Sequence, residues 1–265
     1  MLKKKIAVLG CGNIGMAFIE GVLKSGEIKP SDIIATRRNI NSAGQMTESG
    51  IKLSTDNALA VKESDIIVIA VKSYNFSGVL EEIKDHLDPN RNLIVSITTG
   101  IPVSRIMEET GNKVPVFRAM PNISASVGSS VTCICHSGKE TEQTTTVKEV
   151  FDLIGTTMVI DEDLMESATI LGSCGVAYAL RFIRAMIQGG IQIGFDAATA
   201  SLIVNHTVKG AADLLIEKHR HPENEIDRVT TPKGCTIVGL NEMEHNGFSS
   251  SLIKGIVASF EKIEK

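Results

Sequence analysis

An apolar run, IAVLG (6–10), leads directly into glycines at positions 10, 12 and 15. This G-x-G-x-x-G spacing is a weak signal alone, but here it follows a strand-like run and opens a helix-like segment, 13–26. Gly10 permits a tight turn, Gly12 a close approach of the backbone to a pyrophosphate, and Gly15 close packing of helix on strand. Free N–H groups at the helix start also favour an anion. The stretch therefore predicts a βαβ unit that binds a dinucleotide.

Short apolar runs alternate with helix-like segments through the first 160 residues. Several runs are β-branched and apolar on both faces, which is typical of parallel strands covered by helices. The predicted strands are 6–10, 32–36, 65–71, 92–98, 114–120 and 130–136, followed by a last one that ends in TTMVI (156–160). This alternation predicts an α/β fold with a Rossmann-type doubly wound sheet over residues 1–160.

The pattern changes near residue 161, and only helical periods follow. The acidic residues of DEDLMES (161–167) suit the first turn of a helix. The segment 195–219 is a long helical pattern with small residues that let helices approach closely. Because no flexible linker separates the halves, we expect an all-helical domain, 161–265, joined directly to the first. Its apolar faces predict a homodimer.

Charge and cysteine content narrow the class of protein. The net charge of −4 gives no nucleic-acid footprint, and no apolar run approaches the roughly 20 residues of a membrane span. The apolar part of the start, MLKKKIAVLG, is too short for a signal peptide. Five cysteines without a C-x-x-C pair predict reduced thiols in the cytoplasm. The run His219-Arg220-His221 lacks further ligands, and no metal site is expected.

The end of the second predicted strand indicates which dinucleotide binds. Sites for NAD usually place an acid there, on the ribose 2′-hydroxyl. Here the strand ends in Thr36, Arg37 and Arg38, and the acid Asp32 stands at the opposite end of the strand, at its start. Two guanidiniums and a hydroxyl suit a 2′-phosphate. We therefore expect NADPH, with NADH possible; the alternative is that the arginines belong to a solvated loop.

Two further stretches allow two interpretations each: cofactor binding or a purely structural role. AVK (70–72) ends a strand at the carboxyl edge of the sheet, where ligands of such sheets bind. Lys72 could instead be a solvated loop charge. Asn57 precedes a helix, which it could simply cap.

With the fingerprint, STDN (54–57), AVK (70–72), RAMPN (118–122) and TPKGCTIVGL (231–240) in this order, the chain resembles the pyrroline-5-carboxylate reductase family. The resemblance runs from about residue 4 to 262. It implies reduction of a cyclic imine carboxylate to proline with NAD(P)H. It also implies that the helical halves of two subunits intertwine and that dimers can assemble into decamers.

The residue patterns and the resemblance together predict one set of cofactor-binding residues. They are Gly10, Cys11, Gly12, Asn13, Ile14, Gly15, Thr36, Arg37, Arg38, Asn57, Ala70, Val71, Lys72, Thr99, Met120, Pro121, Asn122 and Glu162. By the same resemblance, the substrate loop comprises Thr231, Lys233, Gly234, Cys235 and Thr236.

The substrate loop has chemistry that suits a small ring acid. Pro232 stiffens the turn, and Gly234 lets the backbone come close to a ligand. The N–H groups at the start of the following helix suit a carboxylate. Thr236 is the predicted catalytic residue, with its hydroxyl near the imine nitrogen; the alternative is that it serves only its own helix as an N-cap or first-turn residue. Lys233 either adds a cation for the carboxylate or points to water.

The substrate half departs from the family pattern. The family usually has AVKP where this chain has AVKS, and SGSGPAY where it has LGSCGVAY (171–178). Lys233 replaces the first glycine of a PGG turn, Arg228 replaces an Asn, and Arg184 stands in a helix that usually reads EAL. Two alternatives therefore stay open. One is a reductase of another cyclic imine amino acid on the same fold, and the other is a non-catalytic regulator that binds a dinucleotide.

Overall fold

The computed structural model describes residues 3–39, 49–138 and 141–263. The chain forms two compact units, which divide between Val176 and Ala177. The first unit contains an eight-stranded sheet with strand order β3-β2-β1-β4-β5-β6-β7-β8. The strands are β1 (Ile6–Leu9), β2 (Ile33–Thr36), β3 (Lys52–Ser54), β4 (Ile66–Ile69), β5 (Leu93–Ser96), β6 (Val116–Met120), β7 (Ser130–His136) and β8 (Gly155–Val159). The doubly wound sheet is thus confirmed.

The strand pairing corrects two details of the sequence prediction. Every neighbouring pair is parallel except β6 and β7, which run antiparallel. The connection 121–129 is shorter than the crossover of about a dozen residues that a parallel pair needs. The strand β3 was not predicted, because its three residues, KLS, form no apolar run.

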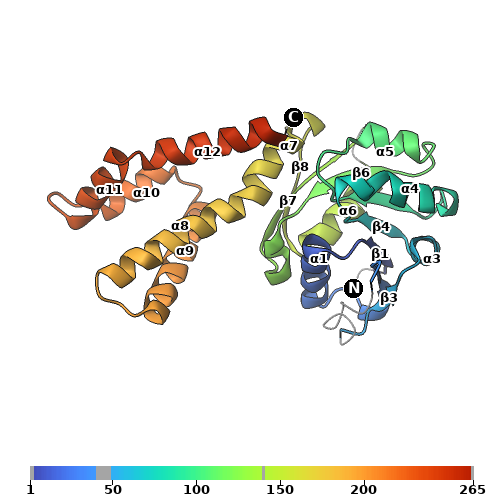
Figure 1. The fold of residues 1–265 in the computed structure, drawn as a ribbon, viewed down its shortest axis with the longest axis horizontal. Helices are drawn as coiled ribbons and strands as arrows, with labels where there is room; N and C mark the ends of the chain where they lie inside the picture. The colour runs from blue at the N-terminus through green and yellow to red at the C-terminus, as the bar shows by residue number, and fades with distance from the viewer. Residues whose placement is uncertain (1–2, 40–48, 139–140, 264–265) are drawn as a thin grey trace. The chain divides into compact units, whose positions relative to one another are not determined.

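Helices cover both faces of this sheet (Figure 1). They are α1 (Asn13–Ser25), α3 (Asn57–Glu63), α4 (Phe76–Ile83), α5 (Val103–Glu109), α6 (Glu142–Asp152) and α7 (Met165–Ala168). Successive strand residues enter opposite cores because side chains alternate across a strand. Ile6 and Val8 pack in one core with α1 and α6, whereas Ala7 and Leu9 pack in the other with α3, α4 and α5. Burial on both faces is why these strands read as continuous apolar runs.

The second unit is helical, as expected from the sequence. Its helices are α8 (Gly175–Gln192), α9 (Ala197–Lys218), α10 (Pro222–Val229), α11 (Cys235–His245) and α12 (Phe248–Ile263). A π-helical turn, Thr169–Cys174, joins α7 to α8 without a linker. Of the described residues from 177 onward, Ala200 and Val204 alone are buried within the chain. The unit therefore lacks a core of its own.

Among the described residues, one continuous helical segment, Glu162–Gln192, is long and apolar enough to cross a membrane. Length and composition alone are weak support for a membrane protein. A helix that packs against a second protein chain can have the same length and composition.

Candidate functional site

The loop after β1 is held against two neighbouring strands. The backbone N–H groups of Gly10 and Cys11 both donate to the Thr36 carbonyl oxygen at the end of β2, each at 3.2 Å. Gly10 has φ +93°, and a Cβ there would lie 2.4 Å from Cγ1 of Val71, just after β4. In the sheet, β1 lies between β2 on one side and β4 on the other, so the strand order reverses direction next to β1. The loop therefore lies at the switch point where ligands of such sheets bind.

The other two fingerprint glycines have different roles. A Cβ on Gly15 would lie 2.7 Å from the Gly10 carbonyl oxygen and 3.3 Å from Cβ of Ala70, so Gly15 allows α1 to pack closely on the strands. A Cβ on Gly12 would meet nothing within 4 Å. Gly12 is also the N-cap of α1, which begins at Asn13. It has no side chain to cap the first backbone N–H groups of this helix. The open approach and the uncapped helix fit a dinucleotide pyrophosphate.

The end of β2 is connected by side chains to α3 and α4. Thr36 is buried, and its hydroxyl donates to Oδ1 of Asn57 at 2.6 Å. The amide nitrogen of Asn57 donates to Oε2 of Glu82 at 2.6 Å. The alternative that Asn57 caps its helix is wrong: the N-cap is Asp56, whose carboxylate accepts the Leu59 N–H at 2.9 Å.

The predicted 2′-phosphate residues stand at the carboxyl end of β2. The Arg37 backbone N–H donates to the Ser54 carbonyl at 3.1 Å, its side chain is half-buried, and Arg38 is exposed. Asp32 lies at the opposite end of this strand, in the short 3-10 helix Pro30–Asp32. No acid therefore follows β2 among residues 36–39.

The loops after β4 and β5 meet at the same edge of the sheet. The hydroxyl of Thr98 donates to the Val71 carbonyl oxygen at 2.9 Å. Lys72 and Thr99, the next residues of the two loops, are exposed. The structure thus gathers the predicted residues that follow β1, β2, β4 and β5 along one edge.

The MPN segment (120–122) is bonded to the π-helical turn. The Asn122 side chain accepts from the Ser124 N–H at 2.9 Å and donates to the Gly172 carbonyl at 2.8 Å. The hydroxyl of Ser173 donates to the Pro121 carbonyl at 2.9 Å. These bonds give Asn122 a structural role within the first unit, and cofactor contact by MPN stays a prediction.

Sequence reasoning missed a buried ion-pair cluster formed by Arg118, Glu162 and Glu166. The Arg118 side chain is 4% exposed; its Nη1 lies 2.9 Å from Oε1 of Glu162 and its Nη2 lies 2.9 Å from Oε1 of Glu166. Burial alone would lower the pKa of Arg118, but the hydrogen bonds to Glu166 and Glu162 outweigh it, so the pKa is raised. The Glu162 Oε1 also accepts the Val103 N–H at 2.8 Å. The signal was a single charge inside the apolar run VPVFRAM (114–120).

The cysteine in the fingerprint is not a nucleophile. Cys11 is buried, and this burial, opposed by the nearby charge of Arg37, raises the pKa of its thiol to about 12. At neutral pH the group is therefore a neutral thiol, whereas the thiolate is the reactive form. All five cysteines are free.

The predicted substrate loop, in the second unit, is a tight turn followed by a helix. The Gly234 N–H donates to the Thr231 carbonyl at 2.9 Å, with Pro232 second in the turn and Lys233 third at φ +60°. A positive φ at the third position is the type II pattern, which glycine adopts without strain. This explains the glycine that the family usually has at this position: it adopts the positive φ without strain, whereas Lys233 does not.

Steric and capping details of this turn separate the roles of its residues. A Cβ on Gly234 would lie 2.6 Å from Oγ1 of Thr231 and 3.0 Å from the Thr231 carbonyl oxygen, so a larger residue here would have to displace Thr231. The helix α11 begins at Cys235, with Gly234 as N-cap and no side-chain cap. The N-cap alternative for Thr236 is therefore wrong. Its side chain is in the first turn and exposed within the chain, as are Lys233 and Cys235.

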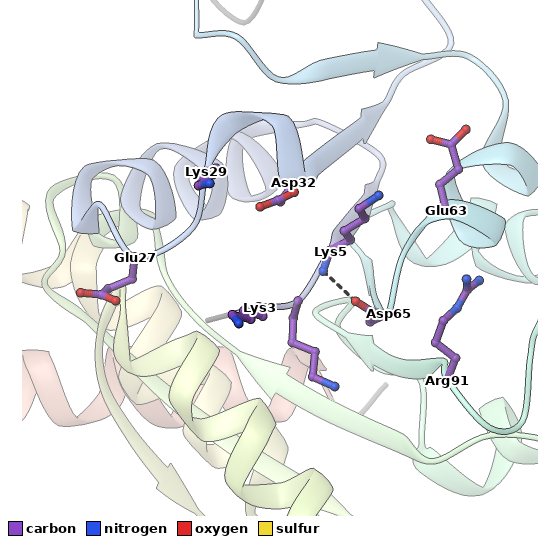
Figure 2. Close-up of a pocket in the computed structure, with 9 residues that line it drawn as sticks. Lys3, Lys5, Glu27, Lys29, Asp32, Glu63, Asp65 and Arg91 are labelled. Atoms are coloured by element: carbon purple, nitrogen blue, oxygen red, sulfur yellow. Dashed lines mark hydrogen bonds between the residues drawn. The ribbon is translucent and has the colours of Figure 1, made fainter. Parts of the chain in front are cut away.

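A separate pocket of about 480 Å³ lies at the amino edge of the sheet (Figure 2). Residues that precede β1, β2 and β4 line it, among them Lys5, Asp32 and Asp65, and the Lys5 N–H donates to Asp65 at 2.8 Å. Its charges are mixed, and it lies at the edge opposite the fingerprint. Within the described residues, no group of three or more His, Cys, Asp or Glu is placed to hold a metal ion.

Comparison with known proteins relates both parts of the chain to one enzyme family. Residues 162–265 match the family model described as pyrroline-5-carboxylate reductase dimerisation, and residues 5–100 match NADP oxidoreductase, coenzyme F420-dependent. The chain is 39% identical over 278 residues to pyrroline-5-carboxylate reductase 2 of Dictyostelium discoideum, covering 99% of this chain and 93% of that protein. It is also 39% identical over 269 residues to reductase 1 of that organism, covering 97% of this chain but only 49% of the relative.

A solved structure has the same fold throughout. The crystal structure of Plasmodium falciparum pyrroline carboxylate reductase with NADP bound superposes with a TM-score of 0.89 at 25% identity. The match covers 99% of this chain and 98% of that one.

Proposed function

The chain belongs to the pyrroline-5-carboxylate reductase family, and on this premise we propose that it reduces 1-pyrroline-5-carboxylate to L-proline with NADPH, the last step of proline biosynthesis. The observation that carries the proposal is full-length similarity to a reductase of that name, combined with an intact fingerprint loop at the switch point of the sheet. In this proposal, residues 1–160 bind the cofactor, and residues 161–265 bind the substrate and form the subunit interface.

The cofactor residues are those at the carboxyl edge of the sheet. The fingerprint loop and the start of α1 hold the pyrophosphate, and Arg37 and Arg38 hold the 2′-phosphate. The side chain of Thr36 is buried and its hydroxyl donates to Asn57, so Thr36 supports the site through its carbonyl oxygen, which accepts from the fingerprint loop. Val71, Lys72 and Thr99 stand on the adjoining loops. When bound, the reduced nicotinamide supplies hydride to the carbon of the substrate C=N bond.

The substrate residues act by holding and orienting a ring acid. The first N–H groups of α11 bind the carboxylate, and the Thr236 hydroxyl bonds the ring nitrogen. A protonated imine is the better hydride acceptor, and its nitrogen ends as an amine, so no strong protein acid is needed. Most of the rate enhancement then comes from positioning.

A direct assay tests this proposal against its two alternatives. Oxidation of NADPH by pyrroline-5-carboxylate, followed by absorbance, is the expected result. Stabilisation by NADPH in thermal shift without turnover of any cyclic imine would instead indicate a regulator. Oxidation of L-proline and its ring homologues with NADP at high pH ranks the substrates. A preference of more than about tenfold for another ring would displace pyrroline-5-carboxylate.

Replacement of Arg37 by alanine is expected to raise the Kd for NADPH roughly tenfold to a hundredfold and to change the Kd for NADH little. The guanidinium makes a charge-assisted contact with a phosphate that NADH lacks. Titration of the intrinsic NAD(P)H fluorescence measures both constants. Arg91→Ala, which removes a cation at the opposite edge of the sheet, is the control. Equal losses for both cofactors would contradict the 2′-phosphate assignment.

Replacement of Thr236 by alanine is expected to lower kcat/KM by a factor of roughly 5 to 150, equivalent to about 1–3 kcal/mol, with the NADPH Kd unchanged. The loss follows from removing a hydrogen bond to the substrate nitrogen. Steady-state kinetics with both substrates varied measures it. Thr236→Ser retains the hydroxyl and should retain most of the activity; an alanine variant with parental kinetics returns Thr236 to a purely helical role.

We also propose a cytoplasmic homodimer. Five free thiols favour a reducing compartment, and the exposed apolar side chains of the second unit favour a partner copy. Assembly of dimers into a decamer rests on the family resemblance alone, and molar mass by light scattering distinguishes the two states.

A further inference from the structure

Arg118 occupies a core position where an apolar residue would be expected. It lies between Val116 and Met120 on the same face of β6, and both of these pack in the apolar core that also contains Cys135 and Met165. The Arg118 Nε is buried without a hydrogen-bond partner among the described residues. Burial of a guanidinium carries a desolvation cost that its two ion pairs have to offset, whereas an apolar residue of similar size would incur no such cost. Stability alone is therefore a poor reason for arginine at this position.

The two carboxylates bonded to Arg118 do different things. Oε1 of Glu166 accepts from Arg118, and its Oε2 is buried without a partner among the described residues. Oε1 of Glu162 accepts from Arg118 and also from the Val103 N–H, the first residue of α5. The N-cap of that helix, Pro102, supplies no side-chain cap, so Glu162 takes this role.

Glu162 needs a second contact to stay in this place. Its side chain is 34% exposed, so water competes with the Val103 N–H for the carboxylate. The guanidinium of Arg118 comes from the core side and bonds the same oxygen that accepts from Val103. Arg118 thereby restricts the rotamer of Glu162 at the start of α5.

The capped helix start also ends a loop that carries a predicted cofactor residue. At the beginning of this loop, the Thr98 hydroxyl bonds the Val71 carbonyl, and Val71 packs against Gly10. At its end, the Val103 N–H bonds Glu162. Between these two bonds lie 99–102, in which Thr99 is exposed and Gly100 has φ +76°. The two ends therefore fix where Thr99 stands.

We propose that Arg118 is a positioning residue for cofactor binding, which acts through Glu162 on the Val103 N–H and so on the loop that carries Thr99. The inference rests on the proposed function in taking Thr99, and also Glu162 itself, as cofactor contacts, since Arg118 holds the carboxylate of Glu162 in place. Glu166 serves to neutralise and hold Arg118 and has no link to the loop.

A pair of variants separates positioning from stability. Glu166→Gln removes one ion pair and leaves the Arg118–Glu162–Val103 chain intact. Arg118→Met in the Glu166→Gln background removes that chain without leaving Glu166 as a buried charge. The measurements are the NADPH Kd by fluorescence titration, hydrogen–deuterium exchange of the Val103 amide, and the melting temperature.

Glu166→Gln is expected to bind NADPH within twofold of the parent and to keep the Val103 amide protected. The double variant is expected to raise the Kd at least fivefold and to speed Val103 exchange at least tenfold. Equal Kd and equal Val103 exchange in the two variants would overturn the proposal, whatever their melting temperatures.

Two further measurements test the role of Arg118 if the double variant does not fold or if the parent protein is not a reductase. If the double variant does not fold, Arg118→Lys replaces it. Its single ammonium cannot form the two-ended fork, so faster Val103 exchange and at least a twofold rise in Kd are expected, and parental values would overturn the proposal. A parent protein that binds NADPH but reduces no cyclic imine would contradict the proposed function, while Kd and exchange would still decide the role of Arg118.

Discussion

Gly12→Val is expected to weaken NADPH binding at least about 100-fold, or roughly 2.7 kcal/mol, with no loss of thermal stability. The backbone of Gly12 has φ −82° and ψ −166°, an extended conformation open to any residue, and a Cβ there meets nothing within 4 Å. The valine side chain would therefore project without strain into the space in front of α1, where the pyrophosphate must come close to the backbone. Fluorescence titration and thermal shift measure the two effects.

Two other glycine variants serve as a control and as a contrast to Gly12→Val. Gly78→Ala, at an open position in α4, should leave NADPH binding unchanged. Gly10→Ala should lose both stability and binding, because φ there is +93° and the new Cβ would lie 2.4 Å from Val71. A Gly12→Val protein that still binds NADPH with parental affinity would show that the dinucleotide does not lie at this loop.

The sheet was predictable because its signals are local. Each buried strand appears in the sequence as a β-branched run, and the fingerprint is six consecutive residues with a recognisable spacing. Its contacts with Thr36 and Val71 follow from the strand order expected for a doubly wound sheet. The direction of β7 was harder to predict from the sequence, because a strand buried on both faces has the same composition in parallel and antiparallel pairing. Only the short connection 121–129 carried the information.

The cluster at Arg118 shows what the sequence leaves hidden. Its partner residues lie 44 and 48 positions away, and they meet Arg118 only because the segment after β8 folds back over β6 and β7. Asn122 and Gly172, 50 positions apart, are a similar case. A lone arginine in an apolar strand could have marked the position, but the sequence does not say which carboxylates it meets. Such long-range polar pairings depend on the tertiary arrangement, which local patterns do not contain.

Ile253→Glu is expected to abolish the dimer and to destabilise the protein by at least about 3 kcal/mol. Ile253 is 61% exposed in the single chain, and Val257, one turn further along α12, is 49% exposed. The described part of the second unit buries only Ala200 and Val204 within the chain, so we expect apolar surface covered by another copy to supply much of its stability. A carboxylate in that interface would be desolvated without a partner. Light scattering gives the molar mass, and circular dichroism gives the loss of helix.

Ser251→Glu introduces the same charge on roughly the opposite side of α12 and should leave both mass and helix content unchanged. The parent should also melt at a temperature that rises with its concentration, by roughly 2–4 °C for each tenfold step, since a dimer gains stability by mass action. A parent protein that is monomeric, melts independently of concentration and tolerates Ile253→Glu would contradict the homodimer. Partition of that monomer into lipid vesicles would then assign the apolar segment Glu162–Gln192 to a membrane instead of a partner copy.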